Sequence, residues 1–198
     1  MKFRRKFVGM TLLVLLTLTT AACAAPKAEG RIVRGNPAAP VTIIEFTDFQ
    51  CPYCGVGAQT LDAMMKKYEG KVKLTVRHYP LPFHPAALPA ALYFEGIAVQ
   101  SPEKAWRFYD ALFAEPEKLS AGEEHLKKVA AGLGVDMQKL DQDVRSAATY
   151  QKIAADKQEF ERAGFDGVPV FVINGTVLVG AQPPQMFAKV IDAALSKK

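Results

Sequence analysis

Apolar and polar positions divide this chain of 198 residues into a β-rich first part, a helical middle and a β-rich last part. Residues 41–46 are almost continuously apolar and rich in β-branched side chains, which is typical of a central strand covered on both faces. Residues 72–79 alternate between apolar and polar positions and predict a second strand, and residues 31–34 predict a short edge strand. An Asn-Gly pair between two β-branched runs, 168–173 and 176–179, predicts a tight hairpin.

From residue 85 to 165 the pattern predicts helices. Ser120 and Glu123 have the spacing of a capping box, which predicts that a helix starts there. After the hairpin, two prolines begin a closing amphipathic helix. The helices predicted for the middle of the chain cover residues 86–99 and 103–114, a segment up to about residue 131, a short segment after Asp136, and residues 149–163.

Two cysteines, Cys51 and Cys54, lie where the first strand gives way to a helical segment at 58–68. The first N–H groups of a helix have no partner within it, and the helix dipole adds partial positive charge at that end. A thiolate is stabilised there, so we expect a lowered pKa for Cys51 and the role of attacking sulfur. Pro52 fits the first helical turn, and Cys54 lies one turn further along. The arrangement favours reversible thiol–disulfide chemistry.

A structural zinc site and an inert disulfide are the two other interpretations of this pair. A zinc site needs two more ligands, but the other cysteine is Cys23 and the three histidines lack a suitable spacing. An inert bridge over so short a ring would restrict the unfolded chain little. No metal is predicted, and His78 and His84 are interpreted as structural residues.

The first 24 residues have the pattern of a secretory signal peptide. Four basic residues precede an apolar run over 7–18, which is short for a membrane span and is followed by small residues. Residues 20–23 resemble the lipobox of bacterial lipoproteins, in which Cys23 becomes the lipidated first residue. Residues 22–24 also fit an A-x-A cleavage site, which would remove Cys23. Export places the protein in the periplasm or cell envelope of a bacterium, where disulfide chemistry operates.

The charge of the chain belongs largely to this signal. Residues 1–24 hold four of the 25 Lys and Arg and none of the 20 Asp and Glu, so the remainder carries 21 positive and 20 negative side chains. A nearly neutral remainder gives no support for nucleic-acid binding.

Glu45 interrupts the apolar strand. A buried charge is costly unless it is paired or neutralised, so two interpretations stand: a strand-end carboxylate that reaches solvent, and a buried acid.

Residues 45–54 and residues 167–175, in this order, resemble the DsbA-like branch of the thioredoxin superfamily. The resemblance covers nearly all of the chain after the signal. It implies an α/β thioredoxin fold with an inserted helical domain. The core would comprise residues 31–84 and 166–198, and the insertion residues 85–165.

The resemblance also implies the roles of three catalytic groups. Cys51 would be the nucleophile and Cys54 the buried resolving thiol. Glu45 matches the position of a buried acid beneath the active site, where desolvation raises the pKa and the carboxyl takes and returns the proton of Cys54.

Pro169 would be the fourth catalytic residue, and three further residues, Pro52, Tyr53 and Val168, would face the substrate. Pro169 matches the cis-proline opposite the disulfide, and Val168 would offer its backbone to a substrate polypeptide. Pro52 and Tyr53 lie between the cysteines, where Tyr53 tunes Cys51 through local electrostatics.

By resemblance, the protein is a monomeric thiol–disulfide oxidoreductase that introduces disulfide bonds into reduced envelope proteins. A DsbB-like or VKOR-like quinone-linked membrane protein would reoxidise it, with no metal or organic cofactor. The Pro-Tyr dipeptide does not decide the direction of electron flow, so a periplasmic reductase or isomerase is an alternative. A non-enzymatic, chaperone-like polypeptide-binding module is another.

Overall fold

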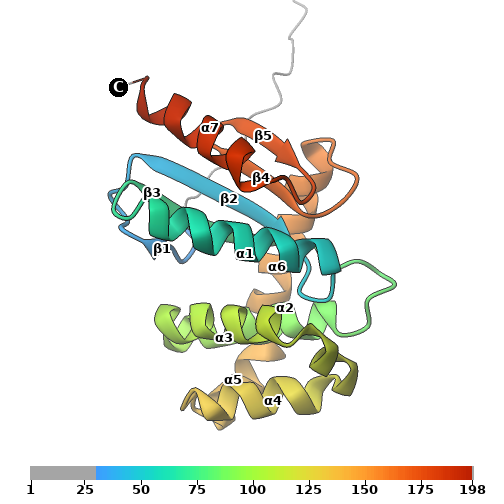
Figure 1. Ribbon diagram of the computed structural model, residues 1–198. Helices are drawn as coiled ribbons and strands as arrows, with labels where there is room; N and C mark the ends of the chain where they lie inside the picture. The colour runs from blue at the N-terminus through green and yellow to red at the C-terminus, as the bar shows by residue number, and fades with distance from the viewer. Residues whose placement is uncertain (1–29, 198) are drawn as a thin grey trace, which may run out of the picture.

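The predicted strands meet in one mixed sheet in the computed structural model, which describes residues 30–197 (Figure 1). The strands are β1 (Arg34–Gly35), β2 (Val41–Thr47), β3 (Val72–His78), β4 (Val170–Ile173) and β5 (Thr176–Val179). Their order across the sheet is β1-β3-β2-β4-β5. β2 and β3 run parallel, and every other neighbouring pair is antiparallel. The predictions for β2, β3 and the hairpin are confirmed, whereas the edge strand covers only Arg34–Gly35 and shares one residue with the predicted 31–34.

Helices cover both faces of this sheet and form a layer beside it (Figure 1). They are α1 (Pro52–Lys67), α2 (Ala87–Gln100), α3 (Pro102–Ala114), the 3-10 helix η1 (Pro116–Ala121), α4 (Glu123–Gly132), α5 (Met137–Val144), α6 (Ala147–Arg162) and α7 (Pro184–Leu195). Within the described residues, helices α2 to α6 follow β3 and precede β4, inside the range predicted for the helical insertion.

Alternation along β2 decides which side chains meet the active-site helix. Successive residues of a strand point to opposite faces of the sheet. Val41 and Ile43 belong to the core that α1 and α7 cover, while Ile44 and Phe46 pack on the opposite face with residues of α6. Glu45 therefore points to the same side as Ile43, towards α1.

Helix α6 contacts both the sheet and the helical layer. It packs against α2, α5 and β3, and Phe160 near its end meets the ring of Phe46 on the sheet. The predicted boundary at residue 165 thus follows a helix shared by both parts. The division into a core and an inserted domain stays a prediction.

A buried ionic network joins the start of the described chain to this helical layer. The Arg31 guanidinium donates to Glu95 Oε1 on α2 at 3.0 Å, to Asp156 on α6, and to the carbonyl of Lys152 at 3.1 Å. The backbone N–H of His78 also donates to Asp156, at 2.9 Å. Because buried charges are tolerated only when they are paired, this network fixes the path of the chain before β1.

The predicted capping box is wrong. Ser120 lies in η1 and donates its hydroxyl to the carbonyl of Glu117 at 2.7 Å. Helix α4 begins after Gly122, whose φ of 61° lies in the left-handed region that glycine adopts readily. The turn at Gly122 therefore separates Ser120 from the helix that it was expected to cap.

The hairpin turn is correct in its residues and in its conformation. Asn174 and Gly175 both have positive φ, 43° and 89°, as a two-residue type I′ turn requires. The Asn174 side chain also accepts from the N–H of Thr42 at 2.8 Å and donates to the carbonyl of Pro40 at 3.1 Å. The turn is thereby attached to the start of β2.

The predicted signal peptide over residues 1–24 and the two alternatives for Cys23 lie outside the described residues. Within residues 30–197, no helix combines the length and the apolar character needed to cross a membrane.

Candidate active site

The two cysteines lie at the start of α1, where the loop from β2 ends. Cys51 is the N-cap residue, with extended backbone angles, and Pro52 is the first helical residue. Cys54 follows one turn later, so both thiols are at the same end of the helix. The Cys51 residue is 7% exposed and Cys54 is fully buried. Both are free thiols.

The surroundings of the two thiols separate their proton affinities. A hydrogen bond from the Cys54 thiol, assisted by the N–H groups of Cys54 and Tyr53, lowers the pKa of Cys51 to about 6; burial and the negative charge of Asp48 oppose this. Burial, together with the charge on Cys51, raises the pKa of Cys54 well above its usual value. At neutral pH, Cys51 is therefore the thiolate and Cys54 the thiol. This is the order that the position at the helix start predicted.

Glu45 is a fully buried acid beneath this pair. It is 0% exposed, so the interpretation of a strand-end carboxylate reaching solvent is wrong. Its Oε2 accepts a hydrogen bond from the Tyr109 hydroxyl at 2.7 Å. Burial raises the pKa of Glu45 to about 7, although the Tyr109 hydrogen bond acts in the opposite direction. Its charge in turn raises the pKa of Cys54, so the two groups are electrostatically coupled.

The segment before β4 lies against the cysteine pair. The Val168–Pro169 peptide bond is cis, which is the conformation that the resemblance implied for Pro169. The Val168 carbonyl oxygen is 3.8 Å from Cys51 Sγ. The structure thus brings together four of the predicted site residues: Cys51, Cys54, Val168 and Pro169.

The remaining predicted substrate contacts, Pro52 and Tyr53, are exposed beside Cys51. The Tyr53 side chain is 68% exposed, and Val56, one turn further along α1, is 50% exposed. Phe83, in the loop after β3, is 71% exposed. Large apolar side chains are therefore exposed to solvent near the start of α1, where a substrate polypeptide would approach the Cys51 thiol.

Asp48 is a site residue that sequence reasoning missed. Its carboxylate accepts from the N–H groups of Gln50 at 2.7 Å and Leu81 at 2.9 Å, and it is paired with His84 Nδ1 at 2.8 Å. Its own N–H lies 3.5 Å from Cys54 Sγ. The contact with Gln50, two residues on, is an Asx turn, so an acid directly after a strand was the available signal.

The two histidines in this region are structural, as interpreted. His84 holds Asp48 in place. His78 is buried, and its Nε2 lies 3.1 Å from Glu95 Oε1. No group of three or more His, Cys, Asp or Glu side chains between residues 30 and 197 is arranged to hold a metal ion.

Comparison with known proteins defines the family. The model of a family described as Thioredoxin matches residues 27–193. The chain belongs to this thioredoxin family.

Solved structures with the same fold include proteins of the DsbA type. The thiol-disulfide exchange protein alpha-DsbA2 from Wolbachia pipientis superposes with a TM-score of 0.73 at 21% identity, covering 84% of this chain and 88% of that one. BdbD from Bacillus subtilis superposes with a TM-score of 0.75 at 20% identity, covering 87% of this chain and 96% of BdbD. A thioredoxin-like oxidoreductase from Silicibacter pomeroyi superposes with a TM-score of 0.72 at 25% identity, covering 83% of this chain and 91% of that protein.

These matches confirm the predicted DsbA-like thioredoxin fold. The cysteine pair at the start of α1 is the feature that the predicted enzyme class, a thiol–disulfide oxidoreductase, requires.

Similar curated proteins are much longer than this chain. The Na(+)/H(+) antiporter NhaA 1 of Mycobacterium sp. strain KMS is 31% identical over 146 residues, which are 72% of this chain and 23% of that protein. The Na(+)/H(+) antiporter NhaA of Herminiimonas arsenicoxydans is 29% identical over 162 residues, which are 82% of this chain and 25% of that protein. The chain thus spans about a quarter of the length of these relatives.

Proposed function

We propose that this protein is an exported disulfide oxidase, which introduces disulfide bonds into envelope proteins through Cys51 and Cys54. The observation that carries the proposal is the unequal pair of thiols: the pKa of Cys51 is lowered to about 6, and that of Cys54 is raised by burial. A stabilised Cys51 thiolate stabilises the reduced form of the pair. A pair with a stable reduced form is a strong oxidant, because it gives up its disulfide readily.

The reaction begins with the oxidised pair. A substrate thiolate attacks Cys51 Sγ, a substrate–Cys51 bond forms, and the Cys51–Cys54 bond breaks. Cys54 leaves as a thiolate and takes a proton. Glu45, a buried acid coupled to Cys54, is the proposed donor of that proton.

A second substrate thiolate then attacks the substrate sulfur of the mixed disulfide. The substrate disulfide forms, and Cys51 leaves as a thiolate. Because its pKa is low, Cys51 is a good leaving group. Two electrons have passed from the substrate to the pair, which is left reduced.

The substrate would be an unfolded or reduced polypeptide. The Val168 carbonyl, 3.8 Å from Cys51 Sγ, is positioned to accept a backbone hydrogen bond from a chain lying across the thiol. The exposed side chains of Tyr53, Val56 and Phe83 supply apolar contact area. Backbone pairing with apolar contacts suits many sequences, as a general oxidase requires.

Turnover needs an electron acceptor. We propose a DsbB-like or VKOR-like membrane protein in this role, with no metal or organic cofactor on this chain, and a monomer as the working state. Location in the periplasm or envelope, through cleavage of residues 1–24 or lipidation of Cys23, belongs to the same proposal.

The reduction potential of the pair tests the direction of electron flow. We would equilibrate the protein lacking residues 1–24 with glutathione buffers and measure the fraction reduced. DsbA has a potential of about −120 mV and thioredoxin about −270 mV. A value near the DsbA end supports the oxidase. A value near the thioredoxin end contradicts it and makes the protein a reductase that receives electrons across the membrane.

The exposed apolar residues around Cys51 also suit a chaperone-like binding module. The Cys51→Ser variant separates this second function from the first. A binding module keeps its suppression of aggregation in this variant, whereas an oxidoreductase loses turnover.

A further inference from the structure

Tyr109 reaches the buried acid from the helical layer. It lies on α3, 64 positions after Glu45, and its hydroxyl donates to Glu45 Oε2 at 2.7 Å. Both residues are almost completely buried, at 2% and 0% exposure. Burial and the nearby Glu45 charge raise the pKa of Tyr109 well above its usual value, so its hydroxyl remains a donor at any working pH.

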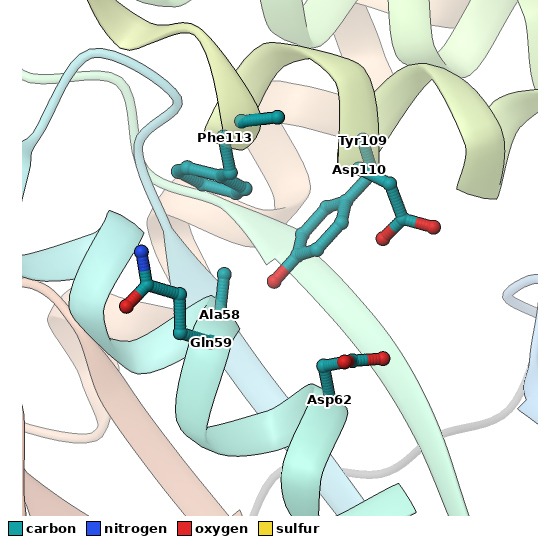
Figure 2. A pocket seen from close by; sticks show the side chains of 7 residues that line it. Ala58, Gln59, Asp62, Tyr109, Asp110 and Phe113 are labelled. Atoms are coloured by element: carbon teal, nitrogen blue, oxygen red, sulfur yellow. The ribbon is translucent and has the colours of Figure 1, made fainter. Parts of the chain in front are cut away.

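A groove of about 480 Å³ lies on the other side of this tyrosine, between α1 and α3. Figure 2 shows the Tyr109 ring projecting from α3 towards α1, above Ala58 and Asp62. Ala58 and Asp62 follow Cys51 by seven and eleven residues, roughly 10 and 16 Å along the helix axis. The groove is therefore displaced along α1 from the face on which Cys51 meets its substrate.

The mouth of the groove is charged, whereas its inner wall is aromatic. The Arg34 guanidinium forms ion pairs with Asp62 on α1, at 3.7 Å, and with Asp110 on α3, at 2.7 Å. Phe113 and Tyr109 of α3 line the wall behind them. The ionisable groups around Tyr109 are thus these two carboxylates and Arg34 on the groove side, and Glu45 and Cys54 on the buried side.

We propose that Tyr109 is a positioning residue of the redox site, whose ring separates Glu45 from the groove and whose hydroxyl stabilises the Glu45 carboxylate. Through Glu45 it controls the proton that passes to and from Cys54. The inference rests on the proposed role of Glu45 and adds a hydrogen-bond donor that lowers the proton affinity of this acid against the effect of burial.

The two parts of the side chain have opposite effects. Removing only the hydroxyl, in Tyr109→Phe, leaves Glu45 buried but takes away a donor to its charged form, so its pKa rises. Removing the ring as well, in Tyr109→Ala, opens the groove to Glu45, so water reaches the carboxylate and its pKa falls. A tyrosine with a merely structural role would not shift the pKa in opposite directions.

The experiment follows Cys54 as it resolves a mixed disulfide between Cys51 and glutathione. The rate of glutathione release is measured against pH by stopped flow in the wild type, Tyr109→Phe, Tyr109→Ala and Glu45→Gln. Cys54 must lose its proton to attack, so the wild-type rate rises as Glu45 becomes a carboxylate, near pH 7. Glu45→Gln removes this inflection.

We expect Tyr109→Phe to move the midpoint up by about one unit, which is the effect of one hydrogen bond to a charged group. Release is then about tenfold slower on the acidic side and unchanged on the alkaline plateau. Tyr109→Ala moves the midpoint down. Tyr93→Phe is the matched control, because this buried tyrosine donates to Glu123 at 3.0 Å in the helical layer, and it keeps the wild-type profile.

An unchanged midpoint in Tyr109→Phe, or a loss of rate that is uniform over all pH values, would overturn the inference. If Tyr109→Ala does not fold, the Tyr109→Phe profile decides alone. An inflection that survives in Glu45→Gln shows instead that the proposed role of Glu45 is wrong. An inflection lost in Glu45→Gln but unmoved in Tyr109→Phe contradicts only the role of Tyr109.

Discussion

The buried acid should make the protein less stable at neutral and alkaline pH, and Glu45→Gln should remove that penalty. Burial raises the pKa of Glu45 from 4.5 to about 7. The folded state therefore binds a proton more tightly than the unfolded state does. Between these two values the folded state holds more protons, so the free energy of unfolding falls as the pH rises.

The expected magnitude follows from the size of the shift. One pKa unit corresponds to 1.36 kcal/mol, so a rise from 4.5 to about 7 costs about 3 kcal/mol once Glu45 is fully ionised. The carboxyl is fully buried, so screening by solvent does not reduce this figure. The penalty is absent below about pH 4.5 and complete above about pH 8.

The assay is urea unfolding of the oxidised protein and of Glu45→Gln at several pH values. In the oxidised form neither cysteine titrates, and other ionisable groups cancel in the difference between the two proteins. Glutamine is neutral throughout and keeps an oxygen for the Tyr109 hydroxyl. We expect the advantage of the variant to grow by about 3 kcal/mol between about pH 4.5 and pH 8.5.

Glu69→Gln is the control, since Glu69 is exposed in the turn after α1. Its difference from the wild type should stay within about 0.5 kcal/mol over the whole range. The reasoning is refuted if the Glu45→Gln difference is the same at both ends of the pH range. That result would mean that the carboxyl titrates as it does in the unfolded chain.

Three further predictions concern the thiol pair, the ionic network and the active-site helix. In Cys54→Ala, the pKa of Cys51 should rise above about 6, because the hydrogen bond from the Cys54 thiol makes the largest contribution to lowering that pKa. The ultraviolet absorbance of the Cys51 thiolate, measured against pH, gives the pKa. An unchanged midpoint would contradict the prediction. Arg31→Met should lower the free energy of unfolding by about 1.5–3 kcal/mol, because Glu95 and Asp156 each lose one of several charged partners. Arg34→Met, which breaks more exposed pairs, should cost at most about 1 kcal/mol, so equal losses in the two variants would refute the difference in burial. Gly57→Ala should cost about 1–3 kcal/mol in the same unfolding assay, because its Cβ would lie 2.7 Å from an aromatic ring of β4; a neutral effect would show that α1 shifts freely.

Local signals in the sequence determined the order of elements and the position of the cysteine pair. The apolar run of β2, the start of α1 at Cys51 and the Asn174–Gly175 turn each depend on residues within a few positions of one another. Periodicity and turn chemistry act over that range, so they are readable without the fold. The capping box failed at the same range, because the positive φ of Gly122 outweighed the spacing of Ser120 and Glu123.

Only the tertiary structure decided what surrounds the pair. Alternation in β2 puts Glu45 on one face of the sheet, but whether that face is dry depends on α1 and on α3, which is far away in the sequence. Tyr109 carries no local sign of its contact with Glu45, and Arg31 carries none of its pairing with Glu95. The sequence therefore identified the cysteine pair, Glu45 and the Val168–Pro169 segment, but it did not identify Asp48 or Tyr109. The packing of distant segments around β2 raised the proton affinity of Glu45, because desolvation and long-range hydrogen bonds arise only when such segments meet.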